Sequence, residues 1–339
     1  MKIAALDVAI IGAGVAGLAA GRALQQAGCR VRLYEKGTGP GGRLATDYCG
    51  SYPFDYGAQN IKVDGTLLKE VLLRELDNDE LITIPAPVCL HSDGQILPPD
   101  TAANETTKYA YQQGIATLPR LLAAGLDIQY DVSVCALEEK EAQYLLLDQD
   151  GVAVGAAKWV ILSAPAPASA AILAASHLQS DESKRISLIE SVQYSRCLTI
   201  LVHYNFSADL PFYALLAQDR SHPLLWLACE NAKGHDNESD GTALVAQLGP
   251  HSSQELWSAT EAQIVNETLR WTAKILGARF LQPQWTKLHR WLHSQPLNPV
   301  DFEAVNPLQS RIIICGDGTA RGRVPEAYAT GLQAAARVG

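Results

Sequence analysis

Residues 7–35 read DVAIIGAGVAGLAAGRALQQAGCRVRLYE, and this stretch decides the fold class. It begins with a short apolar run that ends in glycine, continues through a segment rich in alanine and leucine, and closes with a second apolar run. An apolar run that leads into a glycine turn is typical of a buried parallel strand. Gly28 lies where glycine commonly ends a helix. We therefore predict a strand over residues 7–11, a helix over residues 14–27 and a second strand over residues 31–35, which together form a βαβ unit.

The predicted turn between the first strand and the helix carries Gly12, Gly14 and Gly17 in the spacing G-x-G-x-x-G. In such a turn the first glycine permits the tight bend, the second lets the backbone approach a pyrophosphate, and the third lets the helix pack close to the sheet. The helix N-terminus also attracts phosphate groups. Glu35 ends the second strand at the spacing where a carboxylate binds a ribose diol. The sequence therefore predicts a dinucleotide site, and both NAD and FAD satisfy this pattern.

A second glycine cluster, GPGGRLAT at residues 39–46, follows directly after the predicted βαβ unit. If that unit forms, Gly41, Gly42 and Arg43 lie close to the first glycine turn in space. Their backbone amides and the guanidinium would then contact the same pyrophosphate from its other side. The alternative interpretation is a flexible surface loop with an exposed arginine.

The composition sets limits on the class of protein. The chain has 339 residues, of which 47% are hydrophobic and 19% charged, so it is globular and long enough for about two domains. Its net charge is −9 and no block of Lys or Arg is present, which argues against nucleic acid or an anionic membrane as a partner. The seven cysteines form no C-x-x-C pair, so neither a disulfide framework nor a zinc site is expected. The apolar start leads into the glycine turn without a signal cleavage site, and no stretch reaches transmembrane length, so we expect a cytoplasmic protein.

Further along the chain, strands and helices are predicted in an order that leaves the nucleotide-binding domain and later returns to it. The last strand-glycine-helix pattern resembles the first one in style, which indicates this return. The predicted elements are a helix over residues 109–125, strands over residues 128–137, 143–147, 159–163 and 311–315, and a closing helix that includes residues 326–338.

Five segments together resemble the flavin amine-oxidase superfamily and, within it, its renalase-type members. They read IIGAGVAGLAAGRAL, EKGTGPGGRLAT, FDYGAQNI, LHRWLHSQP and ICGDGTARGRVPEAYATGLQAA, and they are spread over most of the chain. The resemblance implies an α/β fold related to p-hydroxybenzoate hydroxylase, with a Rossmann-type FAD-binding domain and a second, α+β substrate domain. We expect the FAD-binding domain to be discontinuous, over residues 1–62, 110–168 and 305–339. The substrate domain would then take residues 63–109 and 169–304.

The resemblance also implies a role for each matched motif. The carboxylate of Glu35 would bind the adenosine ribose, the motif with Gly42 and Arg43 would lie along the pyrophosphate and flavin, and the YGAQN motif would line the edge of the ring system. Val134 would bond the adenine through its backbone, and Asp317 with the preceding glycine would meet the pyrophosphate and ribityl chain. The full set of implied cofactor-binding residues is Gly12, Gly14, Val15, Ala16, Gly17, Glu35, Lys36, Gly42, Arg43, Gly57, Ala58, Gln59, Asn60, Val134, Gly316, Asp317, Arg323 and Val324.

The closing helix has a physical reason to lie under a flavin. Pro325 stands near its first turn, where proline is favoured. The positive end of the helix would face the N1–O2 edge of the ring and stabilise the anionic reduced flavin. The alternative is a structural Arg323 and an ordinary capped helix.

Motifs that are missing from the sequence exclude several kinds of cofactor attachment and metal site. The segment GTARGRV has no cysteine where some superfamily members attach FAD, so FAD is expected to be noncovalent. No second G-x-G-x-x-G lies between a strand and a helix, so a separate NAD(P)H reductase site is not expected. His289 and His293 are four residues apart, but the Glu of H-E-x-x-H is missing and the segment alternates like a strand, so no metal site is expected. His289 and Trp291 remain candidates for the substrate pocket, with ordinary packing as the alternative.

The resemblance implies an FAD-dependent oxidase that converts the 2- or 6-dihydro isomers of NAD(P)H to NAD(P)⁺. In that reaction flavin N5 takes the hydride and O₂ reoxidises the flavin, giving H₂O₂. No residue is assigned as a catalytic acid or base, because hydride loss from a dihydropyridine yields a stable aromatic cation without proton removal. The expected partners are therefore a dihydronicotinamide dinucleotide and O₂. The alternatives are an amine oxidase or another desaturating flavoenzyme of the superfamily, or a flavin-binding sensor or assembly protein without turnover.

Overall fold

The computed structural model describes residues 6–77, 79–234 and 241–338, and the predicted βαβ unit opens the described chain. It consists of β1 (Leu6–Ile11), α1 (Val15–Gln26) and β2 (Val31–Tyr34), with the two strands parallel and paired. Gly28 follows the helix with a φ of +86°, in the left-handed region that favours glycine. The predicted unit is therefore confirmed, and the first five residues of the expected nucleotide-binding domain lie outside the described residues.

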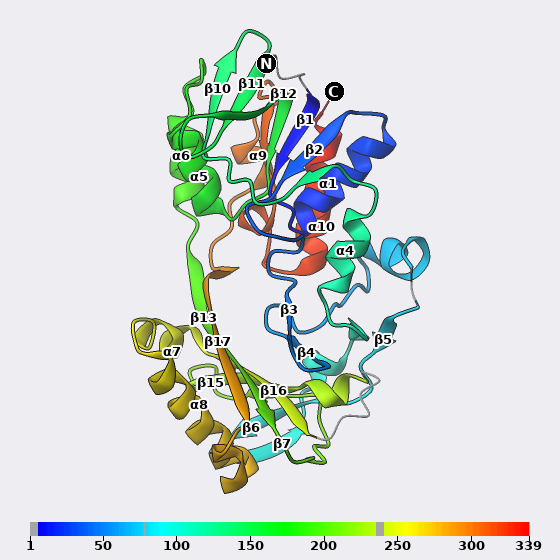
Figure 1. Ribbon diagram of the computed structural model, residues 1–339, viewed down its shortest axis with the longest axis vertical. Helices are drawn as coiled ribbons and strands as arrows, with labels where there is room; N and C mark the ends of the chain where they lie inside the picture. The colour runs from blue at the N-terminus through cyan, green and yellow to red at the C-terminus, as the bar shows by residue number, and fades with distance from the viewer. Residues whose placement is uncertain (1–5, 78, 235–240, 339) are drawn as a thin grey trace.

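A first sheet of seven strands in the described residues is built around this unit (Figure 1). In spatial order it comprises β10 (Ala136–Lys140), β11 (Gln143–Leu147), β12 (Ala153–Leu162), β1, β2 and β9 (Ile128–Gln129), with β18 (Ile312–Ile314) paired to β12. β12 lies parallel to both β1 and β18. The chain thus returns from residue 312 to the centre of the sheet with which it began, which confirms the predicted return.

The first sheet is covered on both faces, which explains the uninterrupted apolar run in β1. Val8 and Ile10 belong to the hydrophobic cluster that contains α1, whereas Ala9 and Ile11 belong to the cluster on the opposite face. Adjacent strand residues point to opposite faces, so both sets must be apolar. A sheet with helices on both faces is the Rossmann-type α/β arrangement that the sequence predicts.

Most of the remaining helices in the described residues are short, and two of them are longer. They are α2 (Leu68–Glu70), α3 (Thr101–Asn104), α4 (Thr117–Ala123), α5 (Ala166–Ala174), α6 (Ser183–Glu190), α7 (Pro250–Glu255), α8 (Glu261–Leu276), α9 (Phe302–Val305) and α10 (Val324–Ala336), with the π-helix η1 (Val71–Glu75) and the 3₁₀ turns η2 (Glu230–Lys233), η3 (Ala278–Leu281) and η4 (Asp317–Thr319). Among the residues that the structure describes, no helix is both long and apolar enough to cross a membrane.

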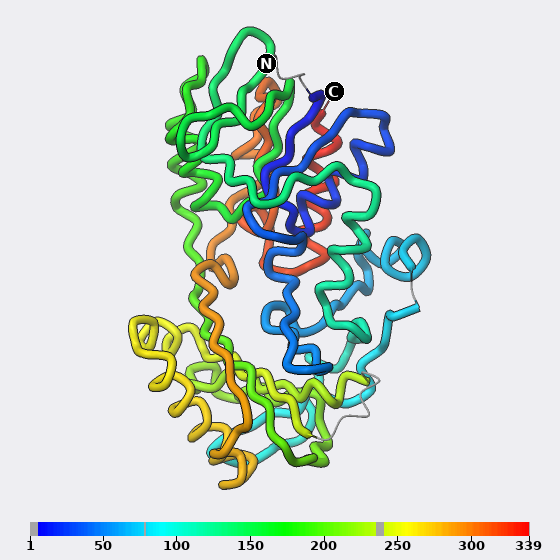
Figure 2. The backbone as a smooth tube through the Cα atoms, viewed as in Figure 1, coloured from blue at the N-terminus to red at the C-terminus, as the bar shows by residue number. Residues whose placement is uncertain are grey.

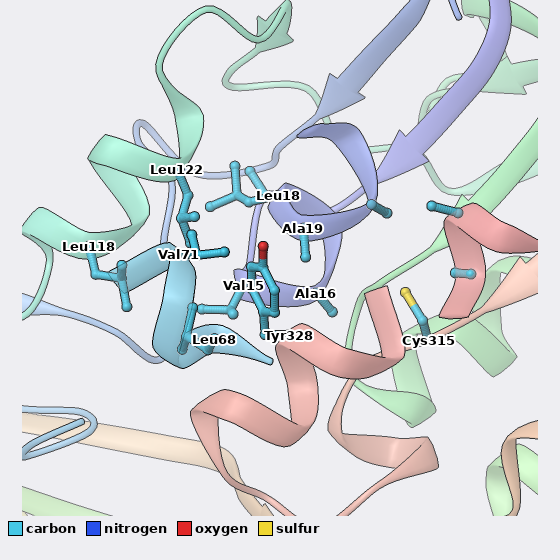
Figure 3. Packing of buried hydrophobic residues seen from close by; sticks show 14 of the residues in the cluster. Val15, Ala16, Leu18, Ala19, Leu68, Val71, Leu118, Leu122, Cys315 and Tyr328 are labelled. Atoms are coloured by element: carbon cyan, nitrogen blue, oxygen red, sulfur yellow. The ribbon is translucent and has the colours of Figure 1, made fainter. Parts of the chain in front are cut away.

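The first and last long helices of the first domain, α1 and α10, pack closely against each other. A Cβ added to Gly331 of α10 would lie 2.1 Å from the carbonyl oxygen of Ala16, so only glycine permits this approach. Figure 3 shows Val15 and Ala16 of α1 beside Tyr328 of α10, with side chains of α2 and α4 closing the cluster from the other side. This packing fixes the start of α10 relative to the glycine turn that precedes α1.

A second sheet lies at the other end of the molecule (Figure 1). Within the described ranges it has seven strands, in the order β17 (Trp285–Pro296), β13 (Tyr194–Tyr204), β16 (Thr242–Leu248), β15 (Leu224–Cys229), β14 (Ala214–Ala217), β6 (Val88–Ser92) and β7 (Gln95–Pro99). α8 covers one face, and its N-terminus has a capping box in which Thr260 and Gln263 satisfy each other's backbone amides. Two smaller antiparallel pairs complete the strands of the described residues. One is β3 (Thr46–Cys49) with β4 (Tyr52–Asp55), and the other is β5 (Leu81–Thr83) with β8 (Tyr109–Tyr111).

The long antiparallel strands β13 and β17 run side by side from the first domain into the second sheet (Figure 2). Their register extends from Tyr194 opposite Pro296 to His203 opposite Trp285. The strand predicted for the segment containing His289 and Trp291 is therefore confirmed, and these two residues lie on one face of β17 because strand side chains alternate.

Two predicted elements are partly wrong. The helix expected over residues 109–125 begins only at α4, because Tyr109–Tyr111 pairs with β5 and Gly114, at φ +85°, interrupts the chain. The strand expected over residues 128–137 is broken after β9, where Asp131 adopts a φ of +56°. Val134 therefore lies in an extended loop before β10 rather than in a strand.

Candidate functional site

The first glycine turn has the shape that a pyrophosphate requires. Gly12 has a φ of +104°, and its amide donates to the carbonyl oxygen of Tyr34 over 2.8 Å. A Cβ on Gly17 would lie 2.1 Å from the carbonyl oxygen of Gly12, so the helix starts as close to the turn as glycine allows. In contrast, a Cβ on Gly14 would have no atom within 4 Å. The backbone at Gly14 therefore borders open space, which is the feature that lets a phosphate approach.

The second glycine cluster lies directly beside the first turn. Gly14 and Gly41 form a parallel bridge, and the amide of Gly41 donates to the carbonyl oxygen of Ala13 over 2.9 Å. Gly42 has a φ of +58°, and a Cβ on it would come no nearer than 3.9 Å, to the Cα of Gly14. The predicted proximity of the two turns is confirmed, and the surface-loop alternative is wrong.

Glu35 fixes the base of this turn. Its carboxylate accepts hydrogen bonds from the amides of Ala13 and Gly37, each over 2.8 Å. Its backbone carbonyl oxygen accepts from the amide of Val132 over 3.0 Å, which brings the loop containing the buried Val134 to the same end of the site. The structure therefore joins Glu35, the residue expected at the ribose, to the segment that contains Val134 through the backbone of Val132.

Arg43 contacts another candidate residue, Asp317. The guanidinium is ion-paired with the Asp317 carboxylate and donates to the carbonyl oxygens of His293 and Ser294 over 3.3 and 3.0 Å. The hydroxyl of Tyr194 donates to the other oxygen of Asp317 over 3.1 Å. Burial acts to lower the pKa of Arg43, but Asp317 outweighs it and the pKa is raised. Arg43 thus joins two cofactor motifs to β17, and its contact with a pyrophosphate stays a prediction.

The remaining candidates of the C-terminal motif lie around the start of α10. Gly316 has a φ of +107°, and its amide donates to the hydroxyl of Thr330 over 2.9 Å. Arg323 is the N-cap residue of α10 and is exposed, and Val324 is its first helical residue. Lys36 is also exposed, and its charge contributes to lowering the pKa of a histidine of β17.

The loop after β4, residues 56–60, is held tightly against Arg43. The amide of Ala58 donates to the carbonyl oxygen of Arg43 over 2.9 Å. A Cβ on Gly57 would lie 2.0 Å from the same oxygen, so glycine is required there. The side chain of Gln247 donates to the carbonyl oxygen of Gly57 over 2.9 Å. Residues from two separate segments thus fix this part of the loop.

The second half of the loop is held by a tyrosine of the second domain. The hydroxyl of Tyr213 donates to the carbonyl oxygen of Gln59 over 2.6 Å and accepts from the side chain of Asn60 over 3.4 Å. The side chain of Gln59 bonds back to the carbonyl oxygen of Asp55. The contacts with Tyr213 therefore depend on how the two domains pack.

Three rings lie together beside the loop and form what we call the aromatic wall: Tyr56, His289 and Trp291. The ring centroids of His289 and Trp291 are 4.1 Å apart, and Tyr56 stacks on Trp291 at 5.4 Å with an interplanar angle of 19°. The Trp291 indole donates to the carbonyl oxygen of Tyr56 over 3.0 Å. Burial and the charge of Lys287 lower the pKa of His289, so its ring is neutral at pH 7. The two candidates from β17 are therefore placed at the loop expected to line the ring system.

A buried lysine cluster lies behind the same loop. The ammonium of Lys233 is 2.7 Å from a carboxylate oxygen of Asp55 and 2.8 Å from one of Glu230, and all three side chains are at most 1% exposed. Asp55 also accepts from the hydroxyl of Thr46 and the amide of Ile115. The cluster ties η2 of the second domain to the strand that leads into the loop.

Sequence reasoning missed several of these contacts. Tyr56 lies within the quoted motif FDYGAQNI, so its position next to Gly57 was available as a signal. No motif marks Tyr194, Tyr213 or Gln247, because they reach the site only through strand pairing across long stretches of sequence.

Comparison with known families agrees with this arrangement. A profile described as flavin containing amine oxidoreductase matches residues 86–339, and one described as NAD(P)-binding Rossmann-like domain matches residues 10–76. The chain belongs to the flavin-containing amine oxidoreductase family. It is therefore a flavin oxidoreductase whose cofactor is FAD, and its family acts on small-molecule substrates with O₂. The glycine turns and the open space at Gly14 fit this cofactor.

Solved structures share the fold over the whole length. A putative protoporphyrinogen oxidase from Exiguobacterium sp. 255-15 has a TM-score of 0.79 at 14% identity, with 99% of each chain covered. Cyclohexylamine oxidase from Brevibacterium oxydans IH-35A has a TM-score of 0.77 at 15% identity, again with 99% of each chain covered. Putrescine oxidase bound to putrescine has a TM-score of 0.74 at 14% identity and the same coverage. At these identities the likeness establishes the two-domain fold alone.

Proposed function

We propose that this flavoenzyme is a renalase-like oxidase. It oxidises 2- and 6-dihydro isomers of NAD(P)H to NAD(P)⁺, and O₂ is reduced to H₂O₂. The observation that carries the proposal is the aromatic wall, which offers flat, uncharged rings beside the loop of residues 56–60. A dihydronicotinamide ring is flat and stacks on such a surface.

The proposed cofactor contacts are those that the resemblance implies. FAD, when bound, supplies the two-electron acceptor. The carboxylate of Glu35 would hold the ribose, the backbone at Gly14 and Gly42 would face the pyrophosphate, and Asp317 would meet the ribityl chain. The binding is noncovalent in this proposal, because Cys315, the nearest cysteine in the C-terminal motif, is buried in the first domain's core.

We also propose the domain limits given by the sequence and a cytoplasmic location. The FAD-binding domain would comprise residues 1–62, 110–168 and 305–339, and the substrate domain residues 63–109 and 169–304. The first sheet and α10 fall within the proposed FAD-binding domain, and the second sheet falls within the proposed substrate domain, which supports these limits. All seven cysteines are free thiols, which supports a reducing compartment.

The protein's part in the reaction is to orient the substrate and exclude water. Stacking on Trp291 and Tyr56 would hold the dihydropyridine ring parallel to the wall. His289 is neutral because burial lowers its pKa. A neutral imidazole can donate a hydrogen bond to the carboxamide or accept one from it without adding charge. The substrate needs no base, because its oxidised product is an aromatic cation that has lost no proton.

Amine oxidation is the second candidate, and the family profile favours it. An alkylammonium must first lose a proton before it can be oxidised, so its rate should rise with pH towards the pKa of the amine. A sensor or assembly role without turnover is not retained, because the chain is an oxidoreductase by family.

The test is anaerobic mixing of the FAD-loaded protein with a panel of donors while the flavin absorbance is followed. We expect rapid bleaching by 2- and 6-dihydro NAD(P), nearly independent of pH, and much slower bleaching by ordinary NADH. Trp291→Leu should weaken binding of these donors about three- to tenfold, the range for a lost stacking contact. Trp271→Leu, on α8 away from the wall, is the matched control. Rapid bleaching by benzylamine or a polyamine, with the dihydronicotinamides inert, would overturn the proposal in favour of amine oxidation.

A further inference from the structure

Two lysines face each other next to the loop of residues 56–60. Ile61 and Tyr109 form an antiparallel bridge with two hydrogen bonds of 2.9 Å, which places Lys62 directly opposite Lys108. The side chains run to neighbouring acceptors of α3: Lys62 donates to the carbonyl oxygen of Ala103 over 2.7 Å, and Lys108 to the side chain of Asn104 over 3.1 Å. Like charges directly opposite each other on two strands are unfavourable.

Within the part of the chain that the structure describes, neither lysine forms an ion pair. Lys108 is only 7% exposed, and its one side-chain hydrogen bond there is to an uncharged amide. Burial and the charges of Lys108 and Arg323 lower the pKa of Lys62, while Asp100 and Glu105 oppose this shift.

Arg323 brings a third positive charge and a helix end. It is the exposed N-cap residue of α10, a helix of 13 residues, so the positive end of the helix lies next to its guanidinium. Across residues 6–77, 79–234 and 241–338, its side chain has no hydrogen bond or ion pair. In the described residues none of these three cations is ion-paired, and Lys108 is more than nine-tenths buried. Lys62 lies two residues beyond Asn60, at the end of the loop of residues 56–60.

We propose that Lys62, Lys108 and Arg323 form an anion site that binds a phosphate group of the substrate dinucleotide. The inference rests on the proposed function, because it assigns the phosphate end of the same substrate. A dihydronicotinamide ring on the aromatic wall would direct its ribose and phosphates out past the loop of residues 56–60, where this site lies. The glycine turns at Gly14 and Gly41 serve FAD, and this proposal assigns Arg323 to the substrate instead of to the FAD contact that the resemblance implies. A simple alkylammonium would gain nothing from the site and would be repelled by it.

The experiment compares donors with and without phosphate. For FAD-loaded wild type, Lys62→Gln and Lys62→Glu, KM is measured for 6-dihydro NAD, for 6-dihydro NADP and for the phosphate-free 6-dihydronicotinamide riboside. We expect the ratio of dinucleotide KM to riboside KM to rise about tenfold or more in Lys62→Glu, as for a lost charge-assisted contact. An effect on both dinucleotides assigns the pyrophosphate, and an effect on the NADP form alone assigns the 2′-phosphate. Lys184→Glu, at an exposed lysine of α6, is the control and should leave the ratio unchanged.

An unchanged ratio in Lys62→Glu would overturn the anion site while leaving the proposed function intact. Binding of ADP-ribose to the oxidised holoenzyme, followed by calorimetry, gives an independent readout. If no dihydronicotinamide bleaches the flavin but Lys62→Glu still weakens ADP-ribose binding about tenfold, the anion site stands and the proposed reaction fails. If ADP-ribose binds equally to both proteins, or to neither, the anion site is wrong. The FAD absorbance of each variant verifies that cofactor loading is unchanged.

Discussion

Removing the ammonium of Lys233 should destabilise the protein strongly. Lys233→Met keeps the volume of the side chain but removes the ammonium that contacts the buried carboxylates of both Asp55 and Glu230. Breaking a buried ion pair from one side typically costs about 3–5 kcal/mol. Asp55 keeps hydrogen bonds from Thr46 and Ile115, which still stabilise its charged form, so we expect a loss near the lower end, about 3 kcal/mol.

The assay is urea unfolding of the FAD-loaded protein at pH 7.5, followed by circular dichroism, with the midpoints of Lys233→Met and wild type compared. Lys158→Met is the matched control, because it removes an exposed ion pair with Asp7 and should change stability by less than about 1 kcal/mol. Adding Glu230→Gln to Lys233→Met should recover part of the loss, because it removes one of the two buried negative charges that face each other once the ammonium is gone. A deficit below about 1 kcal/mol would refute the view that this charge pairing stabilises the domain contact.

Three further predictions concern single residues. Gly57→Ala places a Cβ 2.0 Å from the carbonyl oxygen of Arg43, so it should lower stability by about 1–3 kcal/mol and reduce bound FAD, measured by absorbance after purification. Arg43→Ala should weaken FAD binding by about 1–3 kcal/mol in a fluorescence titration, and unchanged affinity would remove Arg43 from the cofactor site. Burial lowers the pKa of His91 to about 4, so the unfolded chain binds its proton more readily, and stability should fall as the pH drops from about 6.5 towards 4. His91→Gln should flatten that part of the curve of unfolding midpoint against pH, and an equal slope in both proteins would contradict this.

Local patterns of the first domain could be predicted from sequence because the residues that define them are neighbours in the chain. The βαβ unit follows from two apolar runs around a glycine turn, and β17 from the alternation around His289 and Trp291. Residues 109–125 show where local patterns fail. Their apolar content fits a helix, but Tyr109 pairs with Thr83 of β5 and with Ile61, and neither partner can be recognised from the segment itself.

Some contacts of the candidate site could likewise be predicted from the sequence, and others could not. The proximity of Gly41 to Gly14 could be predicted because both flank one βαβ unit. The partner of Arg43 could not, because Asp317 approaches from the other end of the chain and offers a carboxylate already bonded by Tyr194. Lys233 stands in a polar segment that resembles any solvated surface stretch. Only the packing of η2 against β4 shows that it is fully buried.

The pairing of β18 with β12 sets an order in which the nucleotide-binding sheet can be completed during synthesis. The glycine turn of Gly12 leaves the ribosome long before β18 and the Asp317 carboxylate do. Until then the nucleotide-binding sheet lacks a strand next to its centre, and α1 lacks the packing of α10. Contacts between residues so distant in sequence form slowly, since a long loop must close first. Nascent chains that have not yet made β18 and α10 should therefore lack the completed FAD-binding sheet, and FAD should bind only after these elements have emerged.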